Sequence, residues 1–104
     1  MSAWIRVEAP QELDGDHDLI HGRHVLAEGL DVALDMFPTE VLTSSGCAAL
    51  LRLHQFATDV GRQVTVICDE GLALNVLRLT GLVETVEVIV DRPAWSARSF
   101  ALID

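Results

Sequence analysis

Two adjacent hydroxyl groups stand directly before the strongest helical pattern in the chain. Ser44 and Ser45 follow Thr43 and precede Gly46, and an Ala- and Leu-rich segment begins immediately afterwards. The first N–H groups of a helix lack intrahelical partners, and the helix dipole is positive at that end. A serine there can accept one of these N–H groups as a helix cap, which is worth about 1 kcal/mol. Alternatively it can carry a phosphate, which adds about −1.5 to −2 charges to the local surface.

Imidazole and carboxylate groups gather earlier in the chain. His17, His21 and His24 are spaced so that they would share one face of a helix, an arrangement that can bind Zn²⁺ or Ni²⁺. A structural site normally needs four ligands, so a solvated polar face is the competing interpretation. The acidic stretch 14–18 resembles the start of a Ca²⁺-binding loop but lacks its glycine and its final glutamate. We therefore expect no metal and no other cofactor.

Lysine is absent: all seven basic residues are arginine, against 16 acidic residues and a formal net charge of −9. The absence of lysine excludes a phosphate-gripping P-loop and a Schiff-base lysine. An acidic chain without basic clusters is poorly suited to binding nucleic acid or an anionic membrane, because both attract clustered positive charge. The serines also lack the Gly-x-Ser-x-Gly pattern of a hydrolase nucleophile. We expect neither catalytic residues nor an enzyme.

The length and hydropathy indicate one globular domain over residues 1–104. Hydrophobic residues make up 50% of the chain, too many for a disordered acidic tail. Cys47 and Cys68 stand among apolar residues, which is typical of reduced, buried thiols rather than of a disulfide. The first residues lack a signal-peptide pattern, and no apolar run approaches the roughly 20 residues that span a bilayer. These features predict a cytoplasmic protein.

Strand and helix patterns alternate along the chain. Short β-branched or alternating stretches predict strands at 4–7, 31–37, 63–68 and 85–90. Apolar residues at helical spacing, with Gly or Pro signals at the ends, predict helices at about 17–28, 47–60, 72–80 and 93–102. In the longest of these helices the face expected to be buried carries Leu50, Leu53, Ala57 and Val60. Strands joined by helices require crossover connections, so we expect an α/β fold with about four helices packed on a single layer of about four mostly parallel strands.

Three stretches of the chain resemble one known family. The run from Leu42 to His54, LTSSGCAALLRLH, resembles the end of a family strand, its Asp-Ser-Ser-Gly turn and the helix that follows. The run from Asn75 to Leu82, NVLRLTGL, resembles a later helix, and Gln11–Asp14, QELD, resembles the turn before the first helix. On these motifs most of the chain is similar to a STAS domain of the anti-sigma-factor antagonist type, most strongly in residues 41–90.

The resemblance implies a switchable protein-binding module that acts in transcription regulation. Members of this family bind an anti-sigma factor that is also a serine kinase, and this binding frees the sigma factor. The kinase phosphorylates the first serine of the motif, which is Ser44 here, and the complex then dissociates until a serine phosphatase resets it. By the same correspondence, the expected partner-binding residues are Asp14, Thr43, Ser45 and Gly46.

The chain departs from the family pattern at two points. Thr43 stands where the family usually has Asp, and few residues precede Asp14, where the family usually has two strands. The N-terminal strand region is therefore expected to be shortened, which would leave a sheet edge open for a partner or for self-association. These departures keep a second function open, that of a STAS subunit in a lipid or anion transport assembly that needs no phosphorylation.

Overall fold

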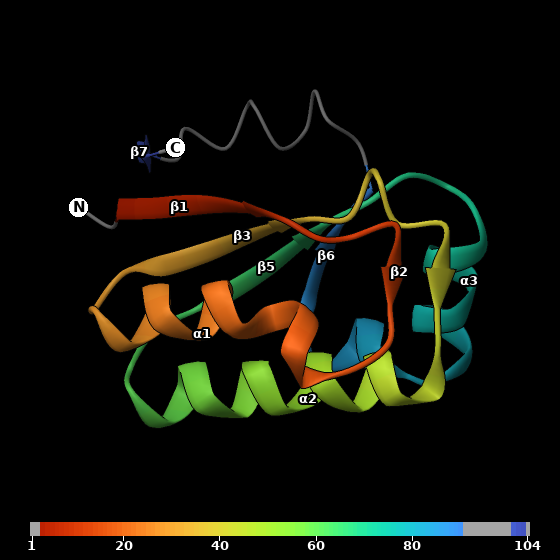
Figure 1. Ribbon diagram of the computed structural model, residues 1–104. Helices are drawn as coiled ribbons and strands as arrows, with labels where there is room; N and C mark the ends of the chain where they lie inside the picture. The colour runs from red at the N-terminus through yellow and green to blue at the C-terminus, as the bar shows by residue number, and fades with distance from the viewer. Residues whose placement is uncertain (1–2, 91–100, 104) are drawn as a thin grey trace.

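A parallel sheet forms one layer of the protein (Figure 1). The computed structural model describes residues 3–90 and 101–103 of the chain. In these residues the sheet has the strand order β6-β5-β3-β1-β7, and every neighbouring pair is parallel. The strands are β1 (Ala3–Glu8), β3 (Asp31–Asp35), β5 (Val64–Ile67), β6 (Glu87–Ile89) and β7 (Ala101–Ile103). The predicted α/β class with a mostly parallel sheet is confirmed.

Helices connect β1 to β3, β3 to β5 and β5 to β6, and α1 and α2 lie on the same face of the sheet (Figure 1). The α-helices of the described residues are α1 (Ile20–Ala27), α2 (Ser44–Asp59) and α3 (Leu72–Leu79), and short 3-10 helices form η1 (Asp16–Leu19) and η2 (Leu82–Glu84). The described part of the chain thus has one α-helix fewer than predicted. None of its helices is long and apolar enough to cross a membrane.

The C-terminal part of the chain differs from the prediction. Of the helix expected at 93–102, residues 93–100 lie outside the described residues, whereas 101–103 form β7. β7 runs parallel to β1, with Leu102 opposite Trp4. The helix prediction is therefore wrong at 101 and 102, because the outer edge of β1 offers backbone partners that a local pattern does not reveal. β1 is consequently an interior strand, and the open edge expected from a shortened N-terminus is not found beside it.

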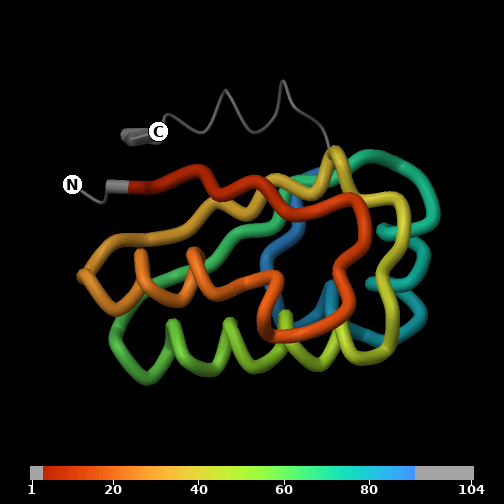
Figure 2. Tube along the Cα trace, viewed as in Figure 1, coloured from red at the N-terminus to blue at the C-terminus, as the bar shows by residue number. Residues whose placement is uncertain are grey.

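A second parallel pair of strands, which the sequence patterns do not predict, lies at one end of the molecule. It consists of β2 (Glu12–Leu13) and β4 (Val41–Leu42), with Glu12 opposite Val41 and Leu13 opposite Leu42. Figure 2 shows the two segments side by side, and β4 leads directly into α2. Because each strand has only two residues, it is too short for an alternating pattern to be recognised.

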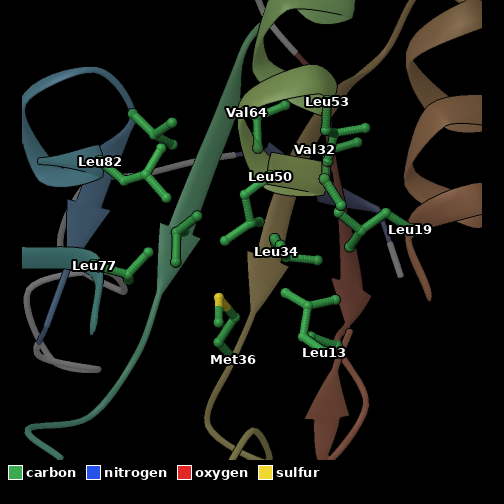
Figure 3. Packing of buried hydrophobic residues seen from close by; sticks show 14 of the residues in the cluster. Leu13, Leu19, Val32, Leu34, Met36, Leu50, Leu53, Val64, Leu77 and Leu82 are labelled. Carbon is green, nitrogen blue, oxygen red and sulfur yellow. The ribbon is translucent and has the colours of Figure 1, made fainter. Parts of the chain in front are cut away.

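The sheet face that meets α1 and α2 holds most of the hydrophobic core (Figure 3). Val32 and Leu34 of β3 belong to one cluster with Leu50 and Leu53 of α2. The prediction that Val60 also lies on this buried face is wrong, because α2 ends at Asp59 and Val60 is 42% exposed.

The opposite sheet face carries a second, smaller cluster. Trp4, Ala33 and Ile67 are buried there, and Phe37 packs against them. These residues alternate with the core-facing positions of β1, β3 and β5, as the two-residue period of a strand requires. The sequence pattern suggests that Trp4 and Trp95 pack at an edge; Trp4 is instead buried within the sheet face, and Trp95 lies outside the described residues.

Candidate functional site

The β2–β4 pair brings the turn that contains Asp14 to the start of α2. The backbone N–H of Thr43 donates to the carbonyl of Leu13 over 3.2 Å, and that of Val41 donates to the carbonyl of Gln11 over 3.1 Å. The side chains of Gln11 and Glu40 also form a hydrogen bond. Two segments that are far apart in the sequence are thereby held in a fixed register.

Thr43 is the helix cap of α2. Its backbone is extended, with φ −83° and ψ 170°, and its Oγ1 accepts a hydrogen bond from the backbone N–H of Gly46 over 3.0 Å. The interpretation of Ser44 or Ser45 as the cap is therefore wrong. The cap lies one residue earlier because the pairing of β4 with β2 keeps Thr43 extended, which is the conformation that a cap residue needs.

The Thr43 hydroxyl also reaches the predicted acidic residue. Its Oγ1 lies 2.7 Å from Oδ1 of Asp14 and donates to that carboxylate, while the carbonyl of Leu13 lies farther away at 3.4 Å. A hydroxyl has a single proton, so the short bond to Asp14 uses it. Of the predicted site residues, Asp14 and Thr43 are thus directly joined.

Ser44 and Ser45 are the first two residues of α2, and both are exposed. Within the described residues, neither hydroxyl has a hydrogen-bond partner. Their positions in the first helical turn place them next to backbone N–H groups that lack intrahelical partners. A phosphate on Ser44 would thus meet these donors and the positive end of the helix dipole, with the carboxylate of Asp14 bound to the preceding residue.

Gly46 lets two backbone segments approach closely in this site. It is buried, and a Cβ at this position would lie 2.1 Å from the carbonyl oxygen of Leu13. Real Cβ atoms do not come this close to an oxygen, so only glycine lets the first turn of α2 approach the Leu13 backbone. The glycine thereby permits the contact between Thr43 and Asp14.

The acidic turn after β2 is tied to α2 at a second point. Asp18 Oδ2 accepts the backbone N–H of Asp14 over 2.8 Å, and Arg52 Nε donates to Asp16 Oδ1 over 2.9 Å. The hydrogen bond and the charge of Arg52 lower the pKa of Asp16 from its ordinary value. These hydrogen bonds hold the turn at residues 14–18, which includes the start of η1, in place beside α2. Within the described chain, no three His, Cys, Asp or Glu side chains are placed to hold a metal ion.

Thr80, which directly follows α3, lies near Cys47 in the first turn of α2, a proximity that sequence reasoning missed. Burial raises the pKa of the Cys47 thiol, and the neighbouring side chain of Thr80 opposes this rise by a smaller amount. Both cysteines are buried and free, as predicted. Thr80 belongs to one of the stretches that carry the family resemblance, but no local signal indicates that it lies near Cys47.

Comparisons with models of protein families, with curated proteins and with solved structures gave no match to this chain. The resemblance to STAS domains therefore rests on the residues quoted above.

Proposed function

We propose that this protein is a phosphorylation-switched binding module of the anti-sigma-factor antagonist type. Its partner is an anti-sigma factor that is also a serine kinase, and Ser44 is the residue that the kinase modifies. Unmodified Ser44 permits the complex, phosphorylated Ser44 dissociates it, and a serine phosphatase restores binding.

The observation that carries this proposal is the contrast between Ser44 and its neighbour Thr43. Ser44 is exposed in the first turn of α2, whereas the Thr43 hydroxyl is engaged with both Asp14 and the backbone of Gly46. A kinase needs an accessible hydroxyl, which favours Ser44 over Thr43. Ser45 is exposed too, so the choice between the two serines rests on the family resemblance and has to be tested.

The switch follows from the size and charge of a phosphate. A partner packed closely over a neutral hydroxyl would have to accommodate a dianion and remove its water, at a cost in binding free energy. The carboxylate of Asp14 is held against the residue before Ser44, so the added charge would also enlarge an existing negative field. The net charge of −9 favours a partner with a basic surface, and binding should weaken as salt increases.

The test is capture of the partner from the native host, followed by incubation of the purified pair with ATP. We expect one phosphate on Ser44 by mass spectrometry, none in Ser44→Ala, and a phosphate still located on Ser44 in the matched variant Ser45→Ala. We also expect Ser44→Asp to weaken the complex. Phosphate on Ser45, or a complex that phosphorylation leaves intact, would contradict the proposal. Capture of a transport ATPase with Ser44 unmodified would favour the transport-assembly function instead.

A further inference from the structure

An exposed apolar ridge runs along α3. Leu72 and Leu79 are 73% and 88% exposed, although both are large aliphatic side chains. With about 3.6 residues per turn, these two positions share one helix face, opposite the buried side chains of Leu74 and Leu77. Val76 lies between them but is half-buried and packs against the core. Single exposed leucines are common, but two on one face of a short helix form a patch that suits contact with another protein.

A hollow opens at the N-terminal end of this ridge. Its volume is about 340 Å³, and the residues that line it include apolar Met36, Leu72 and Ala73 and acidic Glu40, Asp69 and Glu70. The buried Met36 and Ala73 provide apolar walls, while the three carboxylates stand at exposed positions. Glu70 lies 3.5 Å from the guanidinium of Arg78, and Glu40 is bonded to Gln11. Such a lining fits a side chain with an aliphatic stem and a positive end. Of the two residues of this kind, arginine can in addition bind a carboxylate through two hydrogen bonds of its planar guanidinium.

The ridge is continuous with the candidate site. Leu79 directly precedes Thr80, which lies near Cys47 in the first turn of α2. α3 also contacts β4, which leads into Thr43 and Ser44 (Figure 1). A partner that covers Ser44 is therefore well placed to reach Leu79.

We propose that the α3 ridge and its hollow dock an amphipathic helix of the partner, whose aliphatic side chains lie along Leu72 and Leu79 and whose arginine enters the hollow. The inference rests on the proposed function only in that it gives that partner a second region of contact. The negative charge of this surface favours a basic partner over a second copy of this chain. A second copy of this chain would bring the same acidic residues and the same net charge of −9, so the two copies would repel each other. A basic helix, in contrast, would be attracted to the acidic residues of the hollow.

The probe for this inference is a synthetic amphipathic peptide of about 16 residues, with leucines on one face and arginines beside them. Its matched control has glutamate in place of each arginine. Binding to the whole chain is measured by titration calorimetry, and amide chemical-shift changes locate the bound peptide. We expect shifts confined to α3, β4 and the hollow, binding that weakens with salt, and no binding of the glutamate peptide.

Two variants separate docking from unspecific attraction of a basic peptide. Leu79→Asp adds a negative charge, so it strengthens a purely electrostatic association but weakens docking on the ridge, by about tenfold. Val60→Asp adds the same charge at another exposed apolar residue, roughly 20 Å along α2 from Cys47, and should leave docking unchanged. Leu79 is 88% exposed, so its replacement spares the core, which circular dichroism verifies.

Three results would overturn the inference. The first is tighter binding of the peptide to Leu79→Asp than to the unchanged chain, and the second is a set of amide shift changes that lie away from α3. The third is self-association of the chain in sedimentation that Leu79→Asp abolishes, because the ridge would then join two copies. The peptide should bind Ser44→Ala as well as it binds the unchanged chain. Failure of the Ser44 switch therefore leaves this result intact, and failure of peptide docking leaves the switch intact.

Discussion

The hydroxyl of Thr43 lies 2.7 Å from Oδ1 of Asp14 and 3.0 Å from the backbone nitrogen of Gly46. One side chain thus caps α2 and joins it to the turn that follows β2. This geometry accounts for a threonine where the family resemblance leads one to expect aspartate, because oxygens of both side chains can accept the N–H of the third helical residue. Capping is retained at this position, and the exposed hydroxyls are those of the next two residues, Ser44 and Ser45.

Removal of the Thr43 hydroxyl should destabilise the protein. Thr43→Ala loses the cap and the bond to Asp14, and we expect the free energy of unfolding to fall by about 1 kcal/mol, with a range of roughly 0.5–2. Thr43→Ser should retain most of the stability. Urea denaturation of both variants, with the exposed Ser45→Ala as control, measures the difference. Equal stability of Thr43→Ala and Ser45→Ala would show that the cap contributes nothing.

Gly46→Ala should be the more damaging change. The added methyl would meet the Leu13 carbonyl oxygen at 2.1 Å, so either β2 or the first turn of α2 has to shift. Overpacking of this kind costs about 1–3 kcal/mol, and the Thr43 cap would be disturbed as well. Gly71→Ala is the matched control, because a Cβ there meets nothing within 4 Å and the backbone is extended at φ 165°. A thermal midpoint for Gly46→Ala as high as that of Gly71→Ala would disprove the close approach.

The Asp16–Arg52 pair should make the stability of the folded protein decrease at low pH. The hydrogen bond from Arg52 and its charge lower the pKa of Asp16 in the folded protein. The pair therefore contributes stability above the ordinary carboxyl pKa of about 4, and this contribution is lost as the pH falls through the lower folded value. An NMR titration should find the pKa of Asp16 raised in Arg52→Gln. An unchanged value would mean that the two side chains do not interact in solution.

Cys68 should be unreactive in the folded protein. Burial, and after it the charges of Asp69 and Glu70, raise the pKa of this thiol to about 11. Since the thiolate is the reactive form, we expect negligible labelling by a disulfide reagent at pH 8, and full labelling of both cysteines in denaturant. Rapid native labelling of Cys68, mapped by mass spectrometry and compared with Cys68→Ser, would refute its burial.

The alternation of strands and helices could be predicted because each long element carries its own periodic pattern. β3 and β5 are short apolar runs, and α2 has apolar residues at helical spacing up to Ala57. The same patterns imply parallel strands, since a helix between two strands requires a crossover. Patterns fail at the ends of elements, and Val60 is an example: it continues the apolar spacing but lies beyond the last turn of α2.

The amino-acid sequence alone placed two serines at the start of a helix, grouped Asp14 with them by resemblance, and excluded chemistry that needs lysine. Only the tertiary structure decided that Thr43 rather than a serine caps α2, that Gly46 is required by the Leu13 carbonyl, and that Thr80 lies near Cys47. The physical reason is distance along the chain. Periodicity and propensity act over a few neighbouring residues, whereas these contacts join segments about thirty residues apart, which only the packing of β2, β4 and α3 around α2 brings together.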